Sequence, residues 1–262
     1  MSTRRQFLAA AGAASQAPAN RGQIIDAHCH AGRGEAMSAP WNTLADVEVT
    51  LRHMAEAGID RTVIFPINNR EYGKPNREIA AICRRHPDKF IGFAKHDPQT
   101  ESGWIGALLR QEVEQLGLKG LKLHRLPTRE VLDAVAELRI PILYHPEKVS
   151  NFHIIAAEYP RIPFIMAHLG NFASRDWTEH VAAIDICRRY PNVYLETSSV
   201  VFFKFLEMAA KEAGPDKLIF GSDGPELDSR VELHKIKLLK LKPADEAKVL
   251  GGNILRLLNG AG

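Results

Sequence analysis

The segment Ile24-Ile25-Asp26-Ala27-His28-Cys29-His30 decides the fold of this chain. It begins as an apolar run, ends on two histidines, and passes at once into a polar loop that contains glycine. Each of the later apolar runs is similarly rich in branched and aromatic side chains, as in strands that are buried on both faces. The segment is therefore predicted to be the first of eight parallel strands. The other seven are predicted at 61–66, 90–96, 120–124, 141–145, 163–168, 192–197 and 217–223.

Longer amphipathic stretches separate the runs and predict helices. In the first of them Leu44, Val47, Leu51 and Met54 fall on one helical face. Eight strand–helix repeats in 262 residues predict a single-domain (β/α)8 TIM barrel, closed by a final helix at 243–258. An open doubly wound sheet is the competing architecture, but Gly32-Arg33-Gly34 lacks the third glycine of a dinucleotide-binding turn. The predicted helices cover 43–57, 76–85, 102–116, 128–138, 149–158, 176–189, 201–213 and 229–239.

Composition narrows the classes of partner. The formal charge is +3, and acidic and basic residues are interspersed, so no nucleic acid partner is expected. No apolar stretch approaches the roughly 20 residues that cross a bilayer, so no membrane insertion is expected. The three cysteines are too scattered for a disulfide framework or a Cys-x-x-Cys zinc site. A small-molecule substrate is the expected partner.

The first 19 residues predict an export signal rather than part of the fold. The stretch from Ser2 to Leu8 contains Arg4-Arg5 and resembles a twin-arginine signal, and Ala17-Pro18-Ala19 suits a signal peptidase. The predicted division is therefore a signal at 1–19 and a barrel domain at 20–262. We expect a periplasmic protein, and the alternative is a cytoplasmic protein with an alanine-rich N-terminus.

Six of the eleven histidines end apolar runs. The carboxyl ends of parallel barrel strands meet at one mouth, where neutral imidazoles suit a transition metal. The spacing of His28 and His30 places both rings on one strand face, with Ala27 and Cys29 expected on the other. The histidines that end runs are His28, His30, His96, His124, His145 and His168, and Asp223 ends the last run.

The same residues resemble the amidohydrolase superfamily. That family carries Asp-x-His-x-His on strand one, histidines at the ends of strands five and six, and an aspartate at the end of strand eight. The resemblance covers the chain after residue 19 and is greatest to the amidohydrolase-related branch. This branch holds predicted metal-dependent hydrolases and the aminocarboxymuconate-semialdehyde decarboxylase group. The matching motifs are Asp26-Ala27-His28-Cys29-His30, Tyr144-His145-Pro146, Ala167-His168-Leu169-Gly170 and Gly221-Ser222-Asp223.

The resemblance implies one divalent metal ion, with zinc as the expected ion. His28, His30, His145 and Asp223 would be its ligands. Asp223 would also take a proton from the metal-bound water, since a carboxylate that touches both is placed for that step. His168 would act near the open coordination position as a general acid or as a group that polarises the substrate.

Four further residues are candidate substrate contacts. Lys122 and His124 share a strand face and are expected to contact an acidic substrate, with His96 and Arg33 as additional contacts. Two alternatives for Lys122 stay open. In binuclear members of the superfamily the strand-four lysine is carboxylated and bridges two metals, and a lysine stem can also simply pack at the barrel rim.

The motifs leave the reaction open between two chemistries. We expect a hydrolase that attacks an amide, ester or lactone carbonyl, because the loop at 31–42 is short and offers only Arg33. Decarboxylases of the branch have a longer insertion there and more arginine. The alternatives are a non-oxidative decarboxylase of an unsaturated or aromatic acid and a non-catalytic metal- or ligand-binding barrel. The oligomeric state is also open, and a homodimer is one assembly that such barrels adopt.

Overall fold

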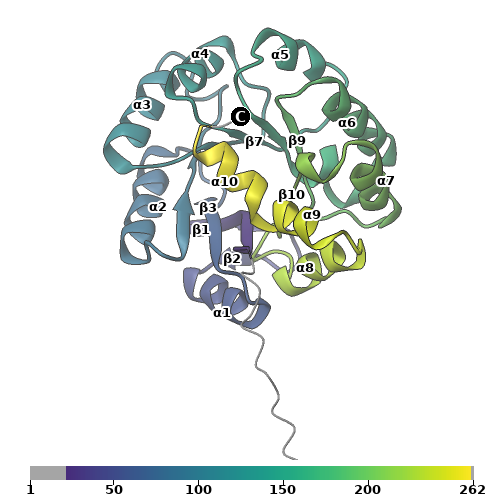
Figure 1. Ribbon diagram of the computed structural model, residues 1–262. Helices are drawn as coiled ribbons and strands as arrows, with labels where there is room; N and C mark the ends of the chain where they lie inside the picture. The colour runs from purple at the N-terminus through teal and green to yellow at the C-terminus, as the bar shows by residue number, and fades with distance from the viewer. Residues whose placement is uncertain (1–21, 261–262) are drawn as a thin grey trace, which may run out of the picture.

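A ring of strands surrounded by helices makes up the protein, as the computed structural model shows for residues 22–260 (Figure 1). The predicted signal at 1–19 lies outside the described residues. Each of the eight predicted strands is present, the third in two pieces. The wall consists of β1 (Ile25–Met37), β3 (Arg61–Pro66), β4 (Phe90–Gly92) continued by β5 (Ala94–Lys95), β6 (Leu121–Leu123), β7 (Ile142–Tyr144), β8 (Phe164–Met166), β9 (Val193–Glu196) and β10 (Leu218–Ile219).

Backbone hydrogen bonds close the wall between its first and last strands. The Ala27 N–H donates to the Phe220 carbonyl at 2.9 Å, and the Asp223 N–H donates to the His28 carbonyl at 2.7 Å. In the wall, β1 pairs in parallel with β3 and β3 with β4. The strands from β5 to β10 also pair in parallel, each with the next. The predicted TIM barrel is confirmed.

Helices follow the strands and form the outer layer (Figure 1). The stretch predicted as one helix at 43–57 instead begins with β2 (Thr43–Ala45), which pairs antiparallel with the extended end of β1. The Asp46 side chain then accepts the Glu48 N–H and caps α1. The outer helices are α1 (Val47–Ala57), α2 (Gly73–Arg85), α3 (Ile105–Leu116), α4 (Arg129–Leu138), α5 (Phe152–Glu158), α6 (Trp177–Arg189), α7 (Lys204–Glu212) and α8 (Ser229–Leu238).

The C-terminal segment closes one end of the barrel. It runs through α9 (Pro243–Ala247), the π-helical η4 (Lys248–Gly252) and α10 (Asn253–Leu258), which crosses the centre of the ring in Figure 1. Ile254 packs in one cluster with interior strand residues such as Ile25, and the Asn253 side-chain amide donates to the Leu218 carbonyl at 2.7 Å. These contacts lie at the strand starts, so the carboxyl ends remain open at the opposite mouth. None of the described helices is both long and apolar enough to cross a membrane.

Candidate metal centre

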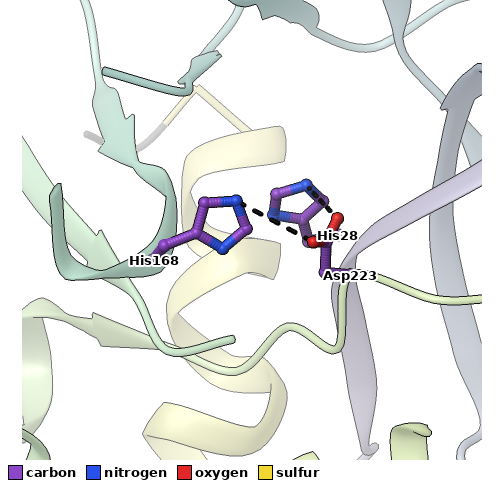
Figure 2. Close-up of side chains that lie close together, drawn as sticks. All are labelled: His28, His168 and Asp223. Atoms are coloured by element: carbon purple, nitrogen blue, oxygen red, sulfur yellow. Dashed lines mark ion pairs between the residues drawn. The ribbon is translucent and has the colours of Figure 1, made fainter. Parts of the chain in front are cut away.

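Three of the predicted site histidines surround the Asp223 carboxylate at the barrel mouth. Asp223 Oδ1 lies 3.1 Å from His28 Nε2 and 3.3 Å from His30 Nε2, and Oδ2 lies 4.0 Å from His168 Nε2. Figure 2 shows the rings of His28 and His168 on one side of this carboxylate. The structure therefore brings together residues that begin and end the barrel wall.

A β-bulge in β1 directs the first two histidines inward. Its pairing with β3 shifts register between Asp26 and Cys29, so Ala27 packs with Ile25 in the interior cluster and His28 also points inward. Asp26 compensates for the irregularity because its carboxylate accepts the backbone N–H of His28 at 3.0 Å. The expectation that Ala27 faces away from the histidines is wrong, since it ignored this extra residue.

Left-handed backbone conformations place the other two cluster residues. His168 and Asp223 both have φ near 58°, a conformation that non-glycine residues seldom adopt. Ala167 already faces the interior, so regular alternation would turn His168 away from it. Each such residue costs on the order of 1–3 kcal/mol and persists only when the surroundings compensate, which is typical of functional sites.

Glu196, at the end of β9, is a site residue that the sequence analysis missed. Its Oε2 lies 2.8 Å from His28 Nδ1 and accepts the His168 backbone N–H at 3.1 Å. A carboxylate oxygen beside Nδ1 favours the tautomer of His28 with the proton on Nδ1, which turns the Nε2 lone pair toward the centre of the cluster. The available signal was the one used for the histidines, namely a polar residue at the end of an apolar run.

Burial keeps most imidazoles of the cluster neutral. It lowers the pKa of His30 to about 4 and the pKa of His145 to about 3, and it holds the pKa of His168 well below the usual range. Burial opposes ionisation of Asp223, but His28 and His168 outweigh it and hold the pKa of this carboxyl well below its usual range. Burial and Lys122 lower the pKa of His28, but Asp223 and Glu196 outweigh them and raise it. A carboxylate with several neutral imidazoles beside it is a donor set for a divalent transition metal.

Unpartnered nitrogens show that this donor set fits a cation. His168 Nε2 and His30 Nδ1 are buried and have no hydrogen-bond partner. One ligand atom each from His28, His168 and Asp223 lies within 4.8 Å of the others. His145, expected as a ligand, lies beside this set with its ring centroid 4.6 Å from that of His168. The structure thus places His168, rather than the expected His145, in the group of possible ligands with His28 and Asp223.

Two of the expected substrate contacts border the cluster. Lys122 is fully buried, and its Nζ lies 3.1 Å from His28 Nε2. The ring of His124 lies 5.0 Å from that of His145, centroid to centroid and tilted by 43°, and His124 lines a cavity of about 350 Å³ together with Arg125 and Tyr144. Both residues therefore lie beside the histidine cluster, Lys122 against His28 and His124 against His145.

The other two candidates lie elsewhere. His96 points out of the barrel toward the helices, where Glu101 lies 2.9 Å from its Nδ1 and Glu112 lies 2.7 Å from its Nε2. Neither ring nitrogen is left for a substrate. Arg33 is exposed and lines a separate cavity with α2, whose Glu78 accepts the Arg33 backbone N–H. Strand alternation explains why His96 points outward, because Ile91, Phe93 and Lys95 take the inward positions.

A TIM barrel with a histidine–aspartate metal centre at its mouth defines the class of this protein. Comparison with family models gives the family, since the model described as Amidohydrolase matches residues 25–260. The chain belongs to this family and is an enzyme of the amidohydrolase superfamily. No curated protein matches the sequence.

Solved structures share the fold at low sequence identity. The 5-carboxyvanillate decarboxylase LigW from Sphingomonas paucimobilis is 15% identical with a TM-score of 0.72, covering 90% of this chain and 99% of that chain. The 2,6-dihydroxybenzoate decarboxylase from Rhizobium is 18% identical with a TM-score of 0.70, covering 92% and 100%. A dihydroxybenzoic acid decarboxylase from Polaromonas sp. JS666, solved with manganese and 2-nitroresorcinol, is 18% identical with a TM-score of 0.71, covering 91% and 97%. These neighbours are decarboxylases, so the expectation of a hydrolase is corrected.

Proposed function

We propose that this enzyme is a metal-dependent, non-oxidative decarboxylase of a small aromatic acid. The mouth carries the proposal, because the neutral imidazoles of His30 and His168 and the buried Lys122 lie around the ionised Asp223 there. Such surroundings favour a small anion. The reaction is supported by the shared fold of the decarboxylases that act on 5-carboxyvanillate and 2,6-dihydroxybenzoate.

One divalent ion would be held by His28, His168 and Asp223, with His30 against the same carboxylate. Zinc is the ion expected from the donor types, and manganese is the second candidate because the Polaromonas sp. JS666 enzyme contains it. When bound, the ion would orient the carboxylate and the neighbouring oxygen of the substrate and polarise that oxygen.

The residues of the chain would supply the binding and the proton. Lys122 would hold the substrate carboxylate through a charge-assisted hydrogen bond. Asp223 would accept the proton of the neighbouring phenol and donate it to the ring carbon that bears the carboxylate. The bond between that carbon and the carboxylate then breaks, carbon dioxide leaves, and the electron pair restores the aromatic ring. Neither an oxidant nor a reductant is consumed.

The test is turnover of hydroxybenzoates by the full chain loaded with manganese or zinc. We expect carbon dioxide and the corresponding phenol in equal amounts from 2,6-dihydroxybenzoate, 5-carboxyvanillate or a related ortho-hydroxy acid. Asp223→Asn should lower kcat/KM by about 10³-fold or more, since it removes both a metal ligand and the proton carrier. Asp228→Asn is the matched control, because this nearby residue caps α8 and pairs with Arg230 outside the cluster, and Asn caps a helix equally well.

Metal-loaded protein that releases no carbon dioxide from any such acid would contradict the proposal. Hydrolysis of esters or lactones without decarboxylation would contradict it as well. Equal losses in Asp223→Asn and Asp228→Asn would show that the effect is not specific to the site.

A further inference from the structure

Lys95, at the end of β5, is a buried cation without a counterion. Its side chain is 1% exposed, and its Nζ donates to the Asn68 side-chain oxygen at 2.7 Å and lies 5.4 Å from the centre of the Tyr72 ring. No carboxylate among residues 22–260 lies within ion-pair distance of this ammonium. An ammonium has three donors, and buried charges in proteins are normally paired.

Lys122 lies beside Lys95 and is likewise buried without a counterion among the described residues. The two residues are register partners on neighbouring parallel strands, so both side chains enter the barrel at one level. The Nζ of Lys122 contacts His28 and lies 5.1 Å from the centre of the Phe65 ring, and again no described carboxylate pairs with it. Burial, with Lys122 adding to it, holds the pKa of Lys95 well below its usual range.

The inward carboxylates are already engaged. Asp223 contacts His28 and His30, and Glu196 holds His28 and the backbone of His168. Neither carboxylate lies within ion-pair distance of the Lys95 or Lys122 ammonium, so both lysines lack a counterion among the described residues. A monocarboxylate held by Lys122 would leave Lys95 without a counterion, whereas a dicarboxylate would supply one to each lysine.

Resting on the proposed function, we propose that Lys95 binds a second acidic group of the substrate, which is therefore an aromatic dicarboxylic acid. Lys122 lies against the metal centre and serves the carboxylate that is lost. Lys95 lies one strand further along the wall, beside Asn68 and Tyr72, and its free donors serve the carboxylate that is kept. The Asn68 amide fixes the ammonium without neutralising it, which leaves its charge for the ligand.

Calorimetric binding to the manganese-loaded full chain tests this assignment without turnover. The probes are benzoate and the three benzenedicarboxylates, which differ by one carboxylate and lack the phenol that the reaction uses. We expect at least one dicarboxylate to bind about tenfold or more tightly than benzoate. Lys95→Met should remove that preference and change the affinity for benzoate by less than about twofold.

Lys119→Met is the matched control, since Lys119 is exposed and precedes β6, at the opposite end of the strand from the mouth. It removes the same charge and should leave all four affinities unchanged. Thermal unfolding separates a binding role from a structural one. Replacing an unpaired buried ammonium with an apolar side chain should leave Tm equal or raise it.

Three results would overturn the assignment. The first is that the wild-type protein binds benzoate and every dicarboxylate with equal affinity. The second is that Lys95→Met loses the same affinity for benzoate as for the dicarboxylates. The third is that Lys95→Met still prefers a dicarboxylate as strongly as the wild-type protein does. The wild-type comparison needs no variant to fold. A protein that prefers dicarboxylates through Lys95 but releases no carbon dioxide would contradict the proposed function and leave the subsite intact.

Discussion

Two buried clusters of histidine and carboxylate lie on opposite faces of the barrel wall, and they differ in how their polar groups are satisfied. Outside the wall, His96 is held between Glu101 and Glu112, and Asn76 donates to Glu112 at 2.8 Å. Inside it, several histidines share Asp223, and His168 Nε2 has no hydrogen-bond partner. Both clusters contain histidine and carboxylate, but the outer one joins the end of β5 to α2 and α3, whereas the inner one joins strand ends.

The difference separates a structural cluster from a functional one. Burial lowers the pKa of His96, but the hydrogen bonds to Glu101 and Glu112 outweigh it and raise that pKa to about 9. At His30, burial outweighs the single contact with Asp223 and lowers the pKa to about 4. A fully paired network stabilises the fold, whereas unpaired buried nitrogens and ammonium groups leave donors and charge for a ligand.

The largest expected effect comes from breaking the inner cluster. His30→Ala should lower kcat/KM for the proposed decarboxylation by about 10³-fold or more, because one of the nitrogens against Asp223 is lost. Bound metal, measured by atomic emission, should fall in parallel. The free energy of unfolding should change by less than about 1 kcal/mol, since His30 has few satisfied partners. A variant with normal metal content would refute the assignment of His30 to the centre.

The matching change in the outer cluster should act on stability instead. His96→Ala leaves two buried carboxylates without their cation, and we expect a loss of about 3–5 kcal/mol in the free energy of unfolding. Urea denaturation measures the loss. Metal content and KM of the folded fraction should stay near wild-type values. If His96→Ala bound metal much more weakly and unfolded with an unchanged free energy, His96 would belong to the metal centre rather than to a structural cluster.

A smaller effect is expected from pH. The pKa of His96 is raised in the folded protein, so its stabilisation is complete below the unfolded value near 6.5 and is lost as pH rises through about 9. The loss amounts to about 3 kcal/mol. We therefore expect the difference in unfolding free energy between wild type and His96→Ala to shrink between pH 6 and pH 10. A difference that is constant over this range would show that His96 does not titrate with the raised pKa.

The eight strands were predictable because each is a short apolar run, and all but the one at 61–66 end at a polar residue. The site could be predicted in part for the same reason, since the carboxyl ends of parallel strands meet at one mouth. His28, His30, His168 and Asp223 were singled out in this way, and the structure brings them together. The reaction was not predictable, because hydrolysis and decarboxylation use the same ligand types.

The assignment of His96 failed because the last residue of its run was taken to face the mouth. His96 ends its run but follows the inward Lys95, so alternation turns its ring outward. Glu196 and Lys95 take inward positions at their strand ends, yet neither is a histidine and both were passed over. Counting alternate positions from the interior residues of each run would have found both.

By itself, the sequence determined where the strands lie and which polar residues end them, since both follow from local hydrophobicity. Only the tertiary structure decided the direction of the ligands. The bulge before His28 and the left-handed residues His168 and Asp223 are costly on their own. They persist because distant groups compensate for them, as when Asp26 of the first strand accepts the backbone N–H groups of both His28 and Ser222. That compensation joins residues almost two hundred positions apart, which no local pattern records.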